Sequence, residues 1–317
     1  MKVLVTGGAG FIGSHVADRL LADGHEVVIL DDLYTGHVEH VPPRARFYQM
    51  DVQSHWLDEL FKIERPEAVV HLAAQASVRR SVEDPVFDAS VNLLGTAALL
   101  QASVHHGVHR FVLASTGGAI YGDTDAIPTP EDAPAVPVSP YGASKLSAEV
   151  YLRTFHALHG LSYAALRYAN VYGPRQDPYG EAGVVAIFSQ RLLRGEIARI
   201  NGDGKQTRDF VYVGDVADAN ARALISDKVG AFNVGTGIET EINRIFALLK
   251  RLTGSDQAET HGPPLAGEQR RSVIDPRKIE TVMGWHPQTT LEAGLNATVQ
   301  YFREAPAARA AVPAQPA

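Results

Sequence analysis

The chain has 317 residues, 45% of them hydrophobic, and is therefore long enough to bury a substantial core in one large domain or two coupled ones. Its net charge of −7, with both signs interspersed, argues against nucleic acid as a partner, because proteins that bind a phosphate backbone carry a basic stripe. The absence of cysteine excludes disulfides, thiolate nucleophiles and cysteine metal sites. The chain begins on a strand pattern without a signal sequence and has no apolar run of roughly 18 residues, so we expect a cytoplasmic protein with no membrane partner.

Short β-branched runs alternate with longer segments of helical period in the first half of the chain. The runs that predict strands are Lys2–Thr6, Glu26–Leu30, Arg46–Asp51, Ala68–Leu72, His109–Ala114 and Ser162–Arg167. The segments that predict helices are Phe11–Ala22, Ser54–Phe61, Pro85–His106 and Pro140–His159. Apolar strands separated by helices are typical of a parallel sheet covered on both faces, so we predict an α/β, doubly wound, Rossmann-type fold.

After about Arg167 the alternation breaks into Gly- and Pro-rich loops with shorter elements. These are a helix at Val184–Arg194, strands at Ala198–Ile200 and Arg208–Val213, and helices at Asp215–Ile225 and Thr240–Leu252. We expect residues 1–167 to form the Rossmann domain, to which 203–230 partly return, and 168–202 and 231–302 to form a smaller mixed α/β substrate-binding region. The Ala- and Pro-rich residues 303–317 predict a disordered tail.

The segment TGGAGFIG joins the first predicted strand to the first predicted helix. Its glycines Gly7, Gly10 and Gly13 permit a tight turn and a close approach of the backbone to a pyrophosphate. The amides of Phe11 and Ile12, at the start of the helix, would stabilise the charge of that pyrophosphate. The segment therefore predicts a dinucleotide site, with a plain strand-to-helix turn as the alternative.

Acidic and small residues follow the neighbouring predicted strands. Asp31 and Asp32 follow the second strand, where a carboxylate binds ribose hydroxyls and repels a 2′-phosphate, so the sequence favours NAD over NADP. Solvated loop charge is the alternative, above all for Asp32. Further cofactor contacts are expected where the third and fourth strands end, at Asp51, Val52, Leu72, Ala73 and Ala74. Asp51 has a helix cap as its alternative, and His71 is expected to be a buried core histidine.

Tyr141 and Lys145 stand four residues apart behind Ser139-Pro140, a helix-start signal. Positions four apart share one helix face, so the phenol and the ammonium point the same way. The fifth predicted strand brings the hydroxyls of Ser115 and Thr116 to the same sheet edge. This group of side chains is suited to proton transfer beside a nicotinamide.

These motifs together resemble the extended short-chain dehydrogenase/reductase superfamily, and the full set looks most like the UDP-glucose 4-epimerase family. The resemblance covers about residues 1–302 and includes HLAAQASVRRSVEDP, SVNLLGT, LRYANVYGPRQDP, TRDFVYVGDVA and FNVGTG. It implies an NAD-dependent isomerase that inverts C4 of a UDP-hexose, either UDP-glucose/UDP-galactose or the N-acetyl forms, through a transient 4-keto sugar. In this mechanism Tyr141 removes the proton of the 4-hydroxyl, Lys145 holds the nicotinamide ribose, and Thr116 or Ser115 binds the 4-oxygen.

For Tyr141 to act as a base near neutral pH, the pKa of its phenol must be lowered. We expect Lys145, the cofactor charge and the helix N-terminus to favour the anion of Tyr141 and so to lower its pKa from about 10.

The resemblance also assigns contacts outside the catalytic group. Cofactor contacts are implied at Asn92, Ser115 and Tyr168, and substrate contacts at Gln75, Asn170, Gly183, Val184, Arg208 and Arg270. An ion pair within the fold is an equal alternative for Arg167. No metal site is expected, since His105, His106 and His109 follow a helix whose C-terminal end suits cations.

Four positions depart from the family pattern or bear on specificity. Gly117 occupies the place of the family's third catalytic hydroxyl, and we expect Thr116 rather than Ser115 to replace it. Leu265 stands where the family has a phosphate-binding arginine, with Glu268 in place of an aspartate, so Arg270 or Arg271 compensates or nucleotide affinity falls. Ser272 falls where the family has its gatekeeper of pocket size, and a small residue there leaves room for an N-acetyl group.

Other activities are known on the same scaffold and are the alternatives to epimerisation. A dehydratase or decarboxylase would also begin by oxidising C4, but Gly117 and Gly118 fill the places of the dehydratase acid/base pair. A non-catalytic NAD sensor would tend to lose the Tyr-Lys pair. The resemblance further implies a homodimer formed by Pro85–His106 and Pro140–His159 of each subunit.

Overall fold

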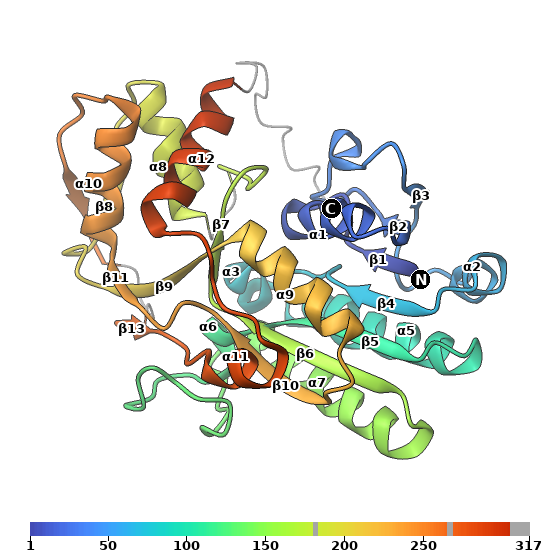
Figure 1. Cartoon of the computed structure of the whole chain (residues 1–317). Coiled ribbons are helices and arrows are strands. Elements are labelled where there is room, and N and C mark those ends of the chain that lie inside the picture. The colour runs from blue at the N-terminus through green and yellow to red at the C-terminus, as the bar shows by residue number, and fades with distance from the viewer. Residues whose placement is uncertain (180–182, 265–268, 305–317) are drawn as a thin grey trace.

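A computed structural model describes residues 1–179, 183–264 and 269–304. Its centre is a seven-stranded sheet with the order β10-β6-β5-β4-β1-β2-β3, in which every pair of neighbours is parallel (Figure 1). The strands are β1 (Lys2–Thr6), β2 (Glu26–Asp31), β3 (Arg46–Gln49), β4 (Ala68–His71), β5 (Arg110–Thr116), β6 (Ser162–Tyr168) and β10 (Gly230–Val234). The predicted doubly wound parallel sheet is confirmed, and β10 extends it by a strand that the sequence did not predict.

Alternate residues of each central strand enter different cores, because successive side chains of a strand point to opposite faces. Val3 and Val5 pack in the core under α1 (Phe11–Ala22) and α9 (Val213–Ile225). Leu4 packs in the opposite core, under α2 (Leu57–Glu64), α5 (Gly95–His105) and α7 (Pro140–His159). Coverage on both faces explains why the strands are continuously apolar.

The helix predicted over Pro85–His106 is confirmed in its extent to within one residue, but it contains a π-helical turn. The segment divides into α4 (Pro85–Ala89), the π-helical turn η2 (Ser90–Leu94) and α5, and is preceded by a short helix, α3 (Val78–Glu83). The Asp84 side chain accepts a hydrogen bond from the Phe87 amide at 2.9 Å and fixes the start of α4. The wider π turn changes the direction in which the following side chains point.

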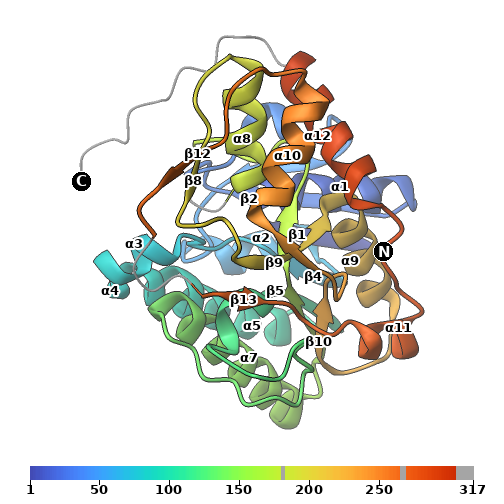
Figure 2. The same cartoon turned by 90° about the vertical axis from the view of Figure 1, so that its left-hand side faces the viewer.

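The smaller layer is built from short strands and three helices that stand together, apart from the helices of the large sheet (Figures 1 and 2). Strand β9 (Thr207–Tyr212) pairs with β7 (Asn170–Tyr172), β11 (Glu239–Glu241) and β13 (Arg271–Ser272), while β8 (Arg199–Asn201) pairs with β12 (Thr260–Gly262). Helices α8 (Val184–Leu193), α10 (Ile242–Thr253) and α12 (Leu291–Glu304) share a third core with this layer. A short α6 (Gly117–Ile120) follows β5, and α11 (Arg277–Met283) packs on β10.

Two predictions concern the edges of the described chain. Arg303 and Glu304, which the sequence assigned to a disordered tail, belong to α12, so that part of the prediction is wrong. The rest of the predicted tail lies outside the described residues, and so do Leu265 and Glu268. In the described ranges no helix has both the length and the apolar character that a membrane span requires.

Candidate active site

The glycine segment after β1 leaves no room for side chains. Gly7 has a φ of 69°, and a Cβ on it would lie 2.6 Å from the Ala73 amide nitrogen. A Cβ on Gly13 would lie 2.0 Å from the Gly7 carbonyl oxygen. Helix α1 begins after Gly10 without a side-chain cap and without an acidic residue in its first turn. The first amides of α1 are thus left to an anion, which is what a pyrophosphate requires.

Three carboxylates gather where β2 and β3 end. Asp31 is buried and accepts hydrogen bonds from the amides of Ala9 at 2.9 Å and Leu33 at 2.8 Å, which leaves further lone pairs for a hydroxyl. Burial and then the nearby charge of Asp51 raise the pKa of Asp32. This concentration of negative charge suits ribose hydroxyls and opposes a 2′-phosphate. Asp51 also accepts from the Gln53 amide at 2.7 Å, so it does cap a turn.

The end of β4 lies against the glycine segment. The Leu72 amide continues the strand pairing by donating to the Thr6 carbonyl at 3.0 Å. His71 is buried between the hydroxyls of Thr6 and Thr96, at 2.7 and 3.0 Å from its two ring nitrogens. Burial, with a smaller effect of the Lys145 charge, lowers the pKa of His71 to about 3. The prediction of a core histidine is confirmed.

Tyr141 lies in the first turn of α7, which begins where the sequence predicted. The Ser139 hydroxyl accepts from the Gly142 amide at 3.2 Å, and Pro140 is the first helical residue. Thr116, the last residue of β5, lies close enough to the Tyr141 side chain to favour its phenolate. This contact places the phenol at the carboxyl edge of the sheet.

Ser115 is engaged by another residue of α7, Glu149, which lies about two turns beyond Tyr141. The Ser115 hydroxyl donates to Glu149 Oε1 at 2.6 Å. Glu149 in turn pairs with Arg167, whose Nη2 lies 2.7 Å from Glu149 Oε2. Arg167 therefore forms the ion pair within the fold that was one of its two alternatives. The geometry favours Thr116 over Ser115 as the hydroxyl that works with Tyr141.

The lowered pKa predicted for Tyr141 is not produced by the protein groups alone. Its side chain is only partly buried overall, but its hydroxyl is surrounded by protein, and this burial, with the charge of Asp88, raises the pKa of Tyr141 to about 12. Burial also lowers the pKa of Lys145 to about 8, against the charges of Asp88 and Glu149. Desolvation outweighs the helix N-terminus, so a phenolate near neutrality needs positive charge from a bound cofactor.

Gly117 is closely packed against a neighbouring side chain. A Cβ there would lie 2.8 Å from the Ile274 side chain. A side chain at position 117 would therefore require Ile274 to shift. On the next residue, Gly118, a Cβ would lie 3.9 Å from Ser272 Oγ and 4.0 Å from Thr116 Oγ1. Ser272, on β13, and Thr116 therefore both lie beside Gly118.

The predicted substrate contacts lie at the border of the two layers. Gly183 is the N-cap residue of α8, which begins at Val184. The first turn of α8 has no acidic residue, and no side chain caps its amides. Asn170 lies on β7, and Arg208, on β9, stands opposite Ser272 in the β9–β13 register. An open helix start and a guanidinium fit the two charges of a diphosphate.

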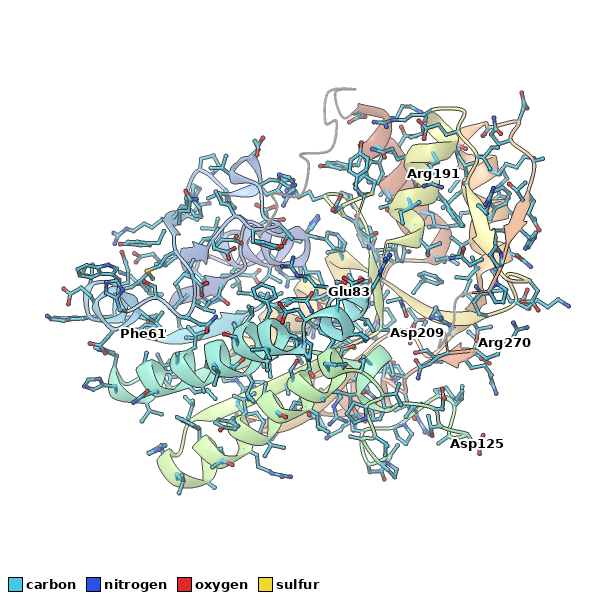
Figure 3. All side chains as sticks on the ribbon, turned by 180° about the vertical axis from the view of Figure 1, so that it is seen from behind. Phe61, Glu83, Asp125, Arg191, Asp209 and Arg270 are labelled. Atoms are coloured by element: carbon cyan, nitrogen blue, oxygen red, sulfur yellow. The ribbon has the colours of Figure 1, made fainter. Side chains whose placement is uncertain are left out.

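The arginines proposed to replace the one missing at Leu265 are already paired. Arg270 forms a bidentate ion pair with Asp203 at 2.7 and 2.9 Å and lies toward the outer edge of the molecule (Figure 3). Arg271 pairs with Glu239 at 2.7 Å. Each would have to leave its carboxylate to bind a phosphate.

Three predicted contacts have side chains that bind other parts of the protein. Gln75 is buried and donates to Asp88 at 2.8 Å, and Asn92 donates to the Gln75 carbonyl at 2.9 Å. The Tyr168 hydroxyl is hydrogen-bonded to Asn220 of α9 at 3.0 Å. Asp88 was not predicted, because a single aspartate on a helix carries no motif; only its spacing of four residues from Asn92 places the two on one face.

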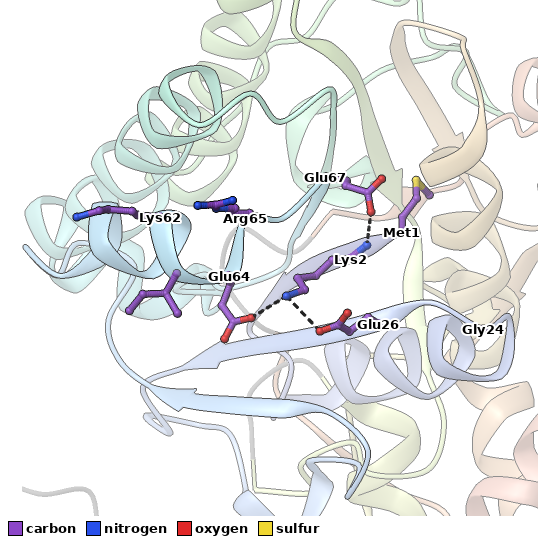
Figure 4. Close-up of a pocket in the computed structure, with 9 residues that line it drawn as sticks. Met1, Lys2, Gly24, Glu26, Lys62, Glu64, Arg65 and Glu67 are labelled. Carbon is purple, nitrogen blue, oxygen red and sulfur yellow. Dashed lines mark hydrogen bonds and ion pairs between the residues drawn. The ribbon is translucent and has the colours of Figure 1, made fainter.

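Two charged features lie away from this edge. Asp58, His105 and His106 bring ligand atoms within 4.8 Å of one another, the one described group of at least three such residues able to hold a metal ion. A hollow at the amino edge of the sheet is lined by charged residues, among which Lys2 Nζ lies 3.2 Å from both Glu26 and Glu64 (Figure 4). Ligands of open α/β sheets bind at the opposite, carboxyl edge, so we assign the charged residues of this hollow to the stability of the sheet and not to ligand binding.

Comparison with known proteins agrees with this geometry. The profile of the NAD dependent epimerase/dehydratase family matches residues 3–235. The chain belongs to this family. The resemblance found in its motifs is thereby confirmed. The UDP-glucose 4-epimerase of Mycolicibacterium smegmatis is 48% identical over 310 residues, which cover 96% of this chain and 99% of that relative.

Solved structures of family members share the whole fold. The UDP-glucose 4-epimerase of Thermotoga maritima, determined with UDP-glucose, has a TM-score of 0.94 and 50% identity over 96% of this chain and 99% of its own. The Thermus thermophilus UDP-glucose 4-epimerase in complex with NAD has a TM-score of 0.92 and 47% identity over 96% of this chain and 100% of its own.

Proposed function

We propose that this chain is an NAD-dependent UDP-glucose 4-epimerase. The observation that carries the proposal is that Tyr141, Lys145 and Thr116 lie together at the carboxyl end of β5. Family members of 47–50% identity that were solved with UDP-glucose or with NAD bear the same activity in their names.

The residues at the carboxyl edge fit NAD. The cradle of Gly7, Gly10 and Gly13 would take the pyrophosphate, and Asp31 a ribose, with Asp32 opposing a 2′-phosphate. Bound NAD supplies a hydride acceptor and donor for C4 of the sugar. The seven-stranded layer would thus hold the cofactor, and the smaller layer the substrate.

The protein's own groups move the proton. Tyr141, as phenolate, would take the proton of the 4-hydroxyl when C4 is oxidised, and would return it to the 4-oxygen when the 4-keto sugar has turned over in the pocket and is reduced on its opposite face. Thr116 would orient the phenol oxygen. Lys145 places a positive charge behind the phenolate and thereby stabilises it.

The diphosphate end would be held by Arg208 and by the amides at Gly183 and Val184. Arg270 would also bind the diphosphate if its guanidinium left the ion pair with Asp203. With Leu265 in the place of an arginine, we expect binding of the nucleotide to depend strongly on Arg208.

Ser272 favours a second substrate. Its small side chain near Gly118 leaves space beside the sugar, so we propose that UDP-N-acetylglucosamine is also epimerised.

A homodimer is part of the proposal. Apolar side chains are exposed along the outer sides of α4, η2 and α7, among them Val86, Leu94 and Leu158 at 78%, 59% and 70%. Two copies that meet through these helices would cover them.

Nuclear magnetic resonance of the purified protein with UDP-galactose tests the activity. Appearance of UDP-glucose with no net change in nicotinamide oxidation supports the epimerase. A 4-keto-6-deoxy sugar would instead identify a dehydratase, loss of carbon dioxide from UDP-glucuronic acid a decarboxylase, and cofactor binding without any turnover a sensor.

A further inference from the structure

Asp88 is a buried carboxylate that the mechanism above does not use. It lies on α4 with 1% of its surface exposed. Its Oδ1 accepts hydrogen bonds from Gln75 Nε2 at 2.8 Å and Asn92 Nδ2 at 3.1 Å. Its Oδ2 is also buried, and no residue in the described ranges gives it a hydrogen bond. A buried carboxylate oxygen without a donor is costly, and such a cost is usually maintained by function.

Hydrogen bonds lead from Asp88 to the catalytic turn of α7. Asn92 Nδ2 donates to Ser144 Oγ at 3.2 Å as well as to Asp88. The Ser144 hydroxyl donates to the backbone carbonyl of Tyr141 at 3.0 Å. The π turn η2 contains Asn92 and directs its amide toward both elements. Through this chain Asp88 is connected to the turn that carries Tyr141 and precedes Lys145.

The other charges that face the pair are already balanced. Glu149, from α7, is neutralised by Arg167 of β6, whose Nε and Nη2 lie 3.0 and 2.7 Å from its two carboxylate oxygens. His71, from β4, is neutral because burial lowers its pKa to about 3. Asp88 forms no ion pair in the part of the chain that the structure describes. Its negative charge is therefore not taken up by an ion pair and acts on Tyr141 and Lys145.

We propose that Asp88 is a positioning residue for the Tyr141–Lys145 pair, which fixes the catalytic turn through Asn92 and Ser144 and acts as the buried counter-charge that holds Lys145 as an ammonium. Only the kinetic test of this inference depends on the proposed function. The physical effect of Asp88 is visible in both partners, since its charge raises the pKa of Tyr141 and opposes the lowering of the pKa of Lys145 by burial.

The variant Asp88→Asn separates charge from shape. An asparagine oxygen can accept from Gln75 and Asn92 as Oδ1 does, and its amide would occupy the place of Oδ2, so the hydrogen bonds persist while the charge is lost. Without the negative charge the phenolate of Tyr141 is easier to form and the ammonium of Lys145 easier to deprotonate. Both limbs of the kcat–pH profile should move to lower pH, by about one unit.

Two variants serve as matched comparisons. Glu83→Gln removes one negative charge from the neighbouring helix α3, where the side chain is 63% exposed and paired with Arg79; it should leave the profile unchanged. Ser144→Ala breaks the link to α7 without a change of charge, and should lower kcat without a shift of either limb. If Asp88→Asn does not fold, Asp88→Ser removes the same charge and should shift the profile in the same direction.

A titration without turnover makes the test independent of the substrate assignment. The ultraviolet difference spectrum between the protein and its Tyr141→Phe variant follows the ionisation of Tyr141, with and without NAD. A lower pKa for Tyr141 in Asp88→Asn supports the proposal even if UDP-galactose is not turned over, in which case only the proposed function fails. An unchanged pKa and an unchanged kcat–pH profile in the neutral variants would overturn it, and leave Asp88 a structural residue.

Discussion

At the scale of the residue, the two hydroxyls that end β5 have different partners. Ser115 donates to Glu149, and Thr116 lies close to Tyr141; both partners belong to α7. The sequence places both hydroxyls at the sheet edge, but the choice between them depends on which residue of α7 each one meets. At Gly117 a side chain would require Ile274 to shift.

The first prediction concerns this pair of hydroxyls. Thr116→Val keeps the shape of the side chain but removes the hydroxyl near Tyr141, and should lower kcat by about 10²-fold with little change in stability. Thr116→Ser should restore most of the activity. Ser115→Ala should instead lower the melting temperature through Glu149 and leave kcat within a few-fold. The reverse pattern would assign the catalytic hydroxyl to Ser115.

Ser272 should determine how large a sugar the site accepts. Ser272→Tyr fills the space beside Gly118 and should reduce kcat/KM for UDP-N-acetylglucosamine by roughly 10²-fold, while kcat/KM for UDP-glucose changes little. Ser272→Ala, which keeps the pocket open, is the control. Equal loss on both sugars in the tyrosine variant would contradict a role in specificity.

At the scale of the element, the amino edge of the sheet depends on one buried carboxylate. Glu64, at the end of α2, is 1% exposed and accepts hydrogen bonds from Tyr48, Lys2 and Arg46 at 2.5, 3.2 and 2.9 Å. Burial alone would raise the pKa of Glu64, but these donors outweigh it and leave the pKa below its usual 4.5. The carboxylate thus ties α2 to β1 and β3.

Stability at this edge should depend on pH. Because the pKa of Glu64 is lower in the folded protein, its contribution is present above about pH 4.5 and is lost as the pH falls through the folded value. Glu64→Gln should lower the free energy of unfolding by about 1–3 kcal/mol at neutral pH and by less near pH 3, as measured by urea denaturation. Glu59→Gln, an exposed change on the same helix, should have little effect at either pH. A loss for Glu64→Gln that does not shrink in acid would contradict the ion-pair account.

At the scale of the whole molecule, the apolar outer sides of α4, η2 and α7 predict association. Leu94→Glu should convert a dimer to a monomer in analytical ultracentrifugation, because it places a charge where two copies would meet. Ile225→Glu, on the 70% exposed end of α9, is the matched control and should leave the dimer intact. A monomeric parent protein would refute the interface.

The large sheet follows from the sequence because its strands are buried on both faces and its helices carry start signals such as Ser139-Pro140. The π turn inside the Pro85–His106 helix does not, since no breaker residue marks η2 in the sequence. The position of Tyr141 could be predicted from its motif. Its raised pKa could not, because desolvation depends on the atoms that tertiary structure brings around the hydroxyl.

The central claim is that Tyr141 is the base of a cofactor-dependent epimerisation at C4. The most direct measurement compares the protein with its Tyr141→Phe variant on UDP-galactose, with bound NAD quantified in both. The account predicts that wild-type protein forms UDP-glucose, and that the variant binds NAD equally well but turns over about 10²–10⁴-fold more slowly. A Tyr141→Phe variant that retains both NAD and full turnover would contradict it.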